Sequence, residues 1–318
     1  MLSSILVLGA AGVANAYTVV AMQSFMFKNI DPIVLPGAYT SHMHTFYGSD
    51  AVTKNTTISA ELRAGCTTAE NLNDQSVYWN PTLYYTGAGE DYTPVAPMRF
   101  SAYYEEIGAA EIPIPENYQL VVGNSSGTTQ ADVDATGSQA QWFCEGDTAP
   151  ADKQAAAFPE TTCSTHLQHL LYFHDCVNPD DLSQHSYSGR NNLPNTNRCP
   201  TGQKRIPRLR FSIRYDLRKV IPNGWSGPPP LVLASGSSFS AHGDFINGWD
   251  TEALTNMLAA TDKKEYAYVA GSLQSGSGGD PTCDATDADP SGGTSDYLES
   301  LTMMAAKARR TIAMAFTA

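Results

Sequence analysis

Basic residues are scarce in this chain, which has 19 Lys and Arg against 32 Asp and Glu, for a net charge of −13. A protein that grips nucleic-acid phosphates needs a basic face, so this balance excludes that class of partner. The richest basic stretch is 204–219, where Arg208, Arg210 and Arg214 recur at even spacing. Such alternation favours one face of a β-strand.

Long apolar runs are also missing, and the one near the N-terminus covers only residues 5–13. That is too short to cross about 30 Å of hydrocarbon, so we expect no membrane span. The run ends in Ala14-Asn15-Ala16, a small-x-small pattern typical of a signal peptidase site. We therefore predict a signal peptide over residues 1–16 and a mature chain that begins at Tyr17. The alternative is a short N-terminal membrane anchor.

The sequence lacks any CxxC pair, which argues against a zinc site built from cysteines. An even count of six cysteines behind a signal peptide predicts three disulfides in a secreted protein, extracellular or in the cell wall. Spacing does not fix their connectivity. We favour pairs that bracket polar loops, Cys144–Cys163 and Cys176–Cys199, which leaves Cys66–Cys283. Two N-glycosylation acceptor sequences, at Asn55 and Asn124, suit the same compartment.

Helical patterns are few, and short runs of β-forming residues dominate. Strands are expected over 77–79, 82–85, 98–104, 118–122, 209–215 and 231–233, with a turn at Asn80-Pro81 between the first two. Helices are expected over 252–260, after an Asp250 cap, and over 296–316. The fold class is therefore mainly β, an antiparallel β-sandwich or jelly roll with long loops and a C-terminal helix. We divide the chain into a signal peptide (1–16), a single β-rich domain (17–270), a flexible loop (271–295) and a helical tail (296–318).

Histidines are the residues that suggest chemistry. In an extended segment His42 and His44 point to one face, where two imidazoles can hold one metal ion or act on one substrate group. A third ligand is needed, and His242 and His185 are the candidates. In His242-Gly243-Asp244 the glycine allows a close turn that brings imidazole and carboxylate together. The alternative is a polar turn in which Asp244 caps a backbone group.

The other histidines have a blander interpretation. His166 and His169 have the spacing of one helical turn, and with His174 they lie around two cysteines, so we interpret them as scaffold. The aromatic cluster Tyr78, Trp79, Tyr84 and Tyr85 is a candidate sugar-stacking surface, or else ordinary core.

Several long motifs in the same order closely resemble a fungal family of secreted proteins, the domain of unknown function nineteen ninety-six. They are FKNIDPIVLPGAYTSHMHTFYGSDAV, AELRAGC, NLNDQSVYWNPTLYY and HGDFINGWD. The likeness covers about residues 31–258. Some members of that family carry a WSC module associated with cell-wall polysaccharide, so the resemblance implies a wall or glycan setting. This chain departs from the family pattern at 173–179, where a Trp is missing, and at 183–188, where one histidine is lost, which suggests an altered member.

Three functions follow from these features. The first is an enzyme, a hydrolase or lyase acting on extracellular or cell-wall polysaccharide, with His42, His44, His242 and Asp244 as catalytic residues. Its substrate-binding residues would be Tyr47, Tyr78 and Trp79. A hydrolase would need two carboxyl groups facing one sugar bond, and the further candidates for them are Glu61, Asp50 and Asp74. The second function is a non-catalytic cell-wall glycan-binding protein. The third is an extracellular metal-binding protein, with a divalent ion as cofactor on His42, His44 and His242. We expect the three imidazoles to meet, with Asp244 or Asp31 orienting one of them, which would favour the enzyme or the metal-binding protein. Scattered histidines would instead favour the glycan binder.

Overall fold

The computed structural model describes residues 17–87, 91–149, 153–189, 199–259, 269–275, 281 and 283–315. The predicted signal peptide lies outside the described residues, as do parts of the predicted loop 271–295. No helix within these ranges is long and apolar enough to cross a membrane.

Two five-stranded antiparallel sheets form the body of the protein. The first has the order β1 (Thr18–Met22), β7 (Arg99–Glu105), β14 (Arg208–Tyr215), β10 (Leu167–Tyr172) and β9 (Gln141–Cys144). The second has the order β2 (Ser24–Lys28), β3 (His44–Gly48), β4 (Val77–Pro81), β16 (His242–Ile246) and β8 (Gln119–Gly123). Runs of β-forming residues predicted β4, and alternation predicted β7, β8 and β14; these predictions are confirmed.

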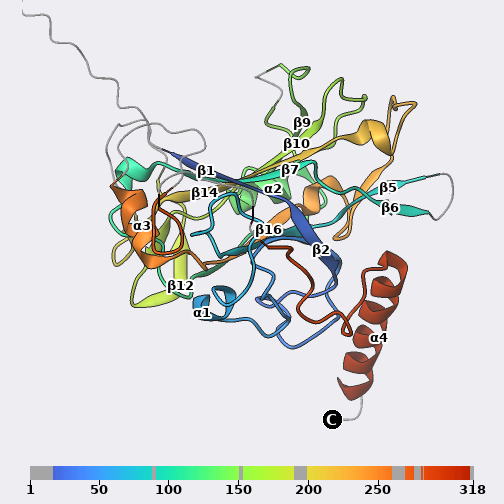
Figure 1. The fold of residues 1–318 in the computed structure, drawn as a ribbon. Helices are drawn as coiled ribbons and strands as arrows, with labels where there is room; N and C mark the ends of the chain where they lie inside the picture. The colour runs from blue at the N-terminus through green and yellow to red at the C-terminus, as the bar shows by residue number, and fades with distance from the viewer. Residues whose placement is uncertain are drawn as a thin grey trace, which may run out of the picture.

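The inner faces of these two sheets pack against each other. Phe100 of β7 stacks on Tyr47 of β3 with ring centroids 4.1 Å apart, and Phe211 of β14 lies 5.9 Å from Tyr78 of β4. Alternate residues on each strand enter this core because side chains alternate between the faces of a sheet. The expected antiparallel β-sandwich is confirmed, and Figure 1 shows β1, β7 and β14 as a layer across one side of the body.

Two three-stranded sheets, four α-helices and three short 3₁₀-helices (Ile107–Ala109, Leu217–Lys219 and Ser238–Ser240) make up the remaining regular structure of the described residues. The sheets are β15 (Leu231–Leu233), β5 (Leu83–Thr86) and β6 (Tyr92–Pro94), and β12 (Asp181–Ser186), β11 (Cys176–Asn178) and β13 (Lys204–Arg205). The helices are α1 (Ser59–Leu62), α2 (Gln130–Thr136), α3 (Thr251–Leu258) and α4 (Tyr297–Ala315). The predicted cap of α3 is present, since the Asp250 carboxylate accepts a hydrogen bond from the Ala253 amide at 3.0 Å. The expected C-terminal helix is α4, which Figure 1 shows at the edge of the body.

The predicted turn at Asn80-Pro81 is wrong. Strand β4 continues through both residues, and the ladder breaks only at Thr82. There the Thr82 amide donates to the Met43 carbonyl at 3.0 Å, and the chain passes from the second five-stranded sheet into a three-stranded one. A change of sheet needs no tight turn, so the proline ends a strand here instead of making a turn.

The outer face of the second sheet is covered by the loops before β3 and around α1. Ile30, Val52 and Leu62 from these segments pack with Phe46, Trp79 and Ile246 from the strands. The covered face is therefore a second, smaller core, and His44 and His242 lie on the same side of the sheet as it does.

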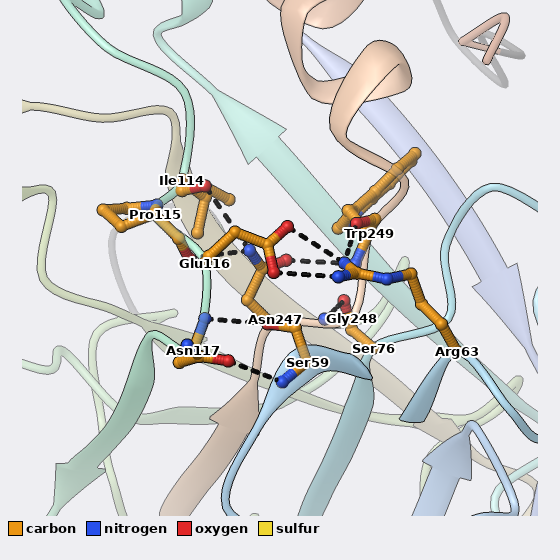
Figure 2. Close-up of polar contacts among 10 residues, drawn as sticks. All are labelled: Ser59, Arg63, Ser76, Ile114, Pro115, Glu116, Asn117, Asn247, Gly248 and Trp249. Atoms are coloured by element: carbon orange, nitrogen blue, oxygen red, sulfur yellow. Dashed lines mark hydrogen bonds and ion pairs between the residues drawn. The ribbon is translucent and has the colours of Figure 1, made fainter. Parts of the chain in front are cut away.

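A polar network anchors α1 beside this cover. Figure 2 shows the Arg63 guanidinium between the Glu116 carboxylate, at 2.9 Å, and the Trp249 carbonyl, at 2.9 Å. The amides of Ser59 and Asn117 donate to each other's side chains at 2.9 and 2.7 Å. The residues that follow His242-Gly243-Asp244, up to Trp249, are thus part of the polar network that holds α1 in place.

Three disulfides are present, with the favoured pairing: Cys66–Cys283, Cys144–Cys163 and Cys176–Cys199. The first closes a separation of 217 residues and ties the C-terminal segment to the region after α1. Loop closure of this length constrains the unfolded chain strongly, so this bond is a long-range tether.

Gly243 provides a test of the sandwich packing. A Cβ atom at this position would lie 2.5 Å from Leu171 Cδ2 and 2.9 Å from Phe211 Cε2, on the opposite sheet. We expect Gly243→Ala to lower the free energy of unfolding by about 1–3 kcal/mol, because both core side chains are fully buried and would have to shift. Urea unfolding monitored by circular dichroism measures this. Gly108→Ala is the matched control, since a Cβ there meets nothing within 4 Å. Equal effects of the two substitutions would contradict the packing.

Candidate metal centre

The strand register brings His44 and His242 to the same level of the second sheet. His44 on β3 pairs with Pro81 on β4, and Asp244 on β16 pairs with Trp79 on β4. Continuing that register by two residues places His242 opposite Pro81 as well. The two histidines are therefore two strand spacings apart, about 10 Å between their backbones. The short Pro81 ring between them leaves room for the imidazoles to meet.

His42 joins them from the loop before β3. Its Nε2 lies 3.0 Å from the Nε2 of His242, and the Nε2 of His44 lies 3.4 Å from the same atom. One ligand atom from each ring lies within 4.8 Å of the other two. The expected convergence of these imidazoles is thus present. His44 and His242 are buried, whereas His42 is partly exposed.

Backbone carbonyls orient two of the rings. The Nδ1 of His44 lies 2.9 Å from the Ile30 carbonyl oxygen, and the Nδ1 of His242 lies 2.9 Å from the Ser240 carbonyl oxygen. A carbonyl only accepts, so each Nδ1 carries the proton. A neutral imidazole has one N–H, so both Nε2 atoms present lone pairs.

Burial keeps the rings neutral. It lowers the pKa of His242 to about 4, and it lowers the pKa of His44 well below the usual value, where the nearby His242 adds to the effect. Burial likewise lowers the pKa of His42, with further contributions from His44 and His242. At neutral pH the site therefore holds three uncharged imidazoles.

This arrangement fits a transition-metal ion. His42 is able to donate an Nε2–H to His242, but the lone pairs of His44 and His242 still face each other at 3.4 Å with no proton between them. Nitrogen ligands about 2.0–2.1 Å from one zinc ion stand roughly 2.9–3.4 Å apart, the range from right-angled to tetrahedral geometry. The separations of 3.0 and 3.4 Å match this range. The third pair of ligand atoms, on His42 and His44, lies within 4.8 Å, so these two rings would have to be drawn together to complete a three-histidine site.

The carboxylates do not orient the imidazoles, and this part of our expectation is wrong. Within the described chain, both oxygens of Asp244 are buried without a hydrogen-bond partner. Burial, and secondarily the charge of Asp31, raises the pKa of Asp244 well above its usual value. Asp31 instead accepts hydrogen bonds from the Ile33 and Val34 amides at 3.1 and 2.9 Å. The backbone supplies the acceptors that we assigned to carboxylates.

The proposed substrate-binding residues are also misplaced. Tyr47, Tyr78 and Trp79 are fully buried, so their rings cannot stack on a sugar. The Tyr78 hydroxyl donates to Asp74 at 2.6 Å, and the Tyr47 hydroxyl donates to Asn80 at 2.9 Å. These aromatics fill the core, which is the alternative that their sequence pattern left open.

His185 does not join His242. It lies next to His174 instead, with their Nδ1 atoms 2.6 Å apart. His169 lies on strand β10 and stacks on Trp142 with ring centroids 4.1 Å apart. The helical turn that we predicted to carry His166 and His169 is therefore wrong. Of the candidate acids, Asp50 accepts from the Cys66 amide and Glu61 from the Thr57 amide. These side chains serve the fold.

Three contributors to the site were missed, namely the carbonyls of Ile30 and Ser240 and the ring of Pro81. A backbone carbonyl has no sequence signature, because its orientation depends on the fold. Pro81 belongs to the NLNDQSVYWNPTLYY motif, but its place between two histidines follows only from the strand order β3-β4-β16.

Comparison with known proteins identifies one family. The model of a family described as Domain of unknown function (DUF1996) matches residues 31–249, which include all three histidines. No curated protein and no solved structure matches the chain.

The lowered histidine pKa values make the stability of the metal-free protein depend on pH. The pKa of His242 is about 4 in the fold, against 6.5 in the unfolded chain, so the unfolded chain takes up the proton first. The stabilising contribution is complete above pH 6.5 and is lost as the pH falls toward 4. It amounts to roughly 3 kcal/mol.

We therefore expect unfolding of the metal-free protein to become easier between pH 6.5 and 4, and His242→Gln to make this dependence shallower. Urea titrations at a series of pH values, with a chelator present, measure it. Parallel profiles for the two proteins would contradict the buried neutral state of His242.

Proposed function

Because the chain belongs to the DUF1996 family, whose description assigns no activity, we propose its function from the site itself: the protein binds one divalent transition-metal ion through His42, His44 and His242. The observation that carries this is the approach of the His44 and His242 Nε2 atoms to 3.4 Å, with a proton on neither. Two buried acceptors without a donor between them are unfavourable, and a shared cation removes the conflict.

The ligand type limits the choice of ion. Neutral imidazoles suit Zn²⁺, Cu²⁺ and Ni²⁺, whereas Mg²⁺ and Ca²⁺ require oxygen ligands. The hydrogen bonds from Nδ1 to the Ile30 and Ser240 carbonyls are of the kind that fix ligand orientation at metal sites. We therefore expect Zn²⁺ or Cu²⁺ to bind and Mg²⁺ to fail.

The number of ligands supports a reactive role in preference to a purely structural one. Structural zinc sites use four protein ligands, whereas catalytic ones use three and leave a position for water or substrate. Here three imidazoles converge, and the partly exposed His42 marks the side of the site that faces solvent. An ion in such a site lowers the pKa of a coordinated water to near neutrality, which supplies a nucleophile.

A second proposal concerns the substrate: a hydrolase or lyase acting on extracellular or cell-wall polysaccharide. Three imidazoles would leave a coordination position for water or substrate, which supports an enzyme, and the three disulfides suit an extracellular, secreted protein. The non-catalytic glycan binder has weaker support, since Tyr78, Trp79 and Tyr84 of its aromatic cluster are buried and Tyr85 is only partly exposed.

Metal titration tests the first proposal. The tag-free protein, stripped with a chelator and titrated with Zn²⁺ in a calorimeter, should bind one ion per chain. His42→Ala and His242→Ala should each weaken binding by at least about 100-fold, because two imidazoles hold the ion far less firmly than three. His166→Ala is the matched control, since His166 pairs with Glu145 away from the site. A wild-type protein that binds no Zn²⁺ or Cu²⁺, or an equal loss in all three variants, would refute the proposal.

A substrate screen tests the second proposal. The metal-loaded protein is incubated with fungal and plant wall polysaccharides, and new reducing ends and unsaturated products are measured. We expect product formation that stops with a chelator and in His242→Ala. Products that persist in both cases would show a reaction independent of this site.

A further inference from the structure

A C-terminal segment outside the family match packs against the residues that carry the metal ligands. The match ends at residue 249, whereas Cys283 is bonded to Cys66 and the described residues continue to 315. We name residues 283–303 the latch. They contact Lys28 and Asn29, which precede the loop that leads to His42, and Tyr39 within that loop.

The first contact is an ion pair beside His44, between a buried lysine and a partly exposed aspartate. Lys28, the register partner of His44, is buried, and its ammonium donates to both carboxylate oxygens of Asp287 at 2.8 and 2.7 Å. It also contacts the Asp289 carbonyl. A buried ammonium needs partners of this kind, so the latch fixes the end of β2.

The second contact runs through Asn29, which is fully buried. Its side-chain oxygen accepts from the Thr294 amide at 2.8 Å, and its side-chain nitrogen donates to the Tyr39 carbonyl at 2.6 Å. The next residue, Ile30, supplies the carbonyl that orients His44. Asn29 therefore connects the latch directly to the acceptor that sets the tautomer of a ligand.

The third contact is made by Tyr39, in the loop that leads to His42. The Tyr39 hydroxyl donates to the Asp289 carboxylate, and this bond raises the pKa of Tyr39 to about 12. The backbone comes close here: a Cβ at Gly293 would lie 2.6 Å from the Asn29 side-chain oxygen, and Gly293 has φ +72°. Glycine is thus required at this point by both space and backbone conformation.

We infer that the latch is a positioning element of the metal site, acting through Lys28, Asn29 and Tyr39 on the ligands His44 and His42. This inference rests on the proposed metal function. The latch touches none of the three imidazoles in the contacts described, so its effect is on ligand orientation. Loss of comparable supporting contacts at metal sites weakens affinity by about 10–100-fold.

Asp287→Asn removes one carboxylate charge from the Lys28 pair. We expect Zn²⁺ affinity to fall by about 10–100-fold, and Asp287→Glu to restore most of it. Asp284→Asn is the control, because it removes the same charge from the same segment and the Asp284 side chain is exposed. Spectroscopy separates positioning from general loosening. The visible absorption of bound Co²⁺ reports ligand geometry and should change in Asp287→Asn at saturating metal, but not in Asp284→Asn.

Tyr39→Phe guards against a variant that fails to fold, since it removes only the bond to Asp289 and keeps the ring. It should weaken Zn²⁺ binding in the same direction with an unchanged circular dichroism spectrum. If Asp287→Asn and Tyr39→Phe both bind Zn²⁺ like the wild type while His242→Ala does not, the latch inference is overturned and the metal site stands. If the wild-type protein binds neither Zn²⁺ nor Co²⁺, both are overturned.

Discussion

The candidate site depends on the antiparallel register of β3, β4 and β16. Register decides which face each side chain occupies, and a slip by one residue would turn His44 or His242 into the sandwich core. Gly243 constrains the register from the other face, because it lies against Leu171 and Phe211 where no side chain fits. The motif His242-Gly243-Asp244 thus combines two requirements. The histidine faces the outer cover, and the glycine permits close packing of the sheets.

The outer face of the second sheet contains buried polar groups without hydrogen-bond partners. Such groups destabilise a fold, which favours a functional role for this face. Neither carboxylate oxygen of Asp244 nor the indole nitrogen of Trp79 has a partner among the described residues, although both side chains are fully buried. Buried polar groups are normally satisfied, so an unpartnered carboxylate two residues from His242, on the same face of the sheet, calls for an explanation. Sequences depart from good packing rules mainly where activity requires it.

Sequence patterns predicted the sandwich because alternation of apolar residues directly reflects the two faces of a strand. They also identified His42, His44 and His242, but they assigned the orienting role to Asp244 and Asp31. A sequence shows where carboxylates are, but it does not show that the Ile30 and Ser240 carbonyls orient the imidazoles. Tyr47, Tyr78 and Trp79 were misassigned for a related reason. Aromatic residues suit both a core and a sugar-binding surface, and only burial separates the two.

Burial and a lowered pKa do not by themselves mark a functional histidine in this protein. His169 is buried, with a pKa lowered to about 3, yet it lies flat on Trp142 and its role is packing. His174 is half-buried and has its Nδ1 next to that of His185, a contact that one shared proton satisfies. At His44 and His242 the backbone takes the Nδ1 proton, and the two Nε2 atoms, which carry no proton, lie 3.4 Å apart. A proton cannot resolve that contact without breaking a backbone hydrogen bond or charging a buried ring. A cation resolves it without either cost, and this difference separates the three converging histidines from the other buried histidines of the fold.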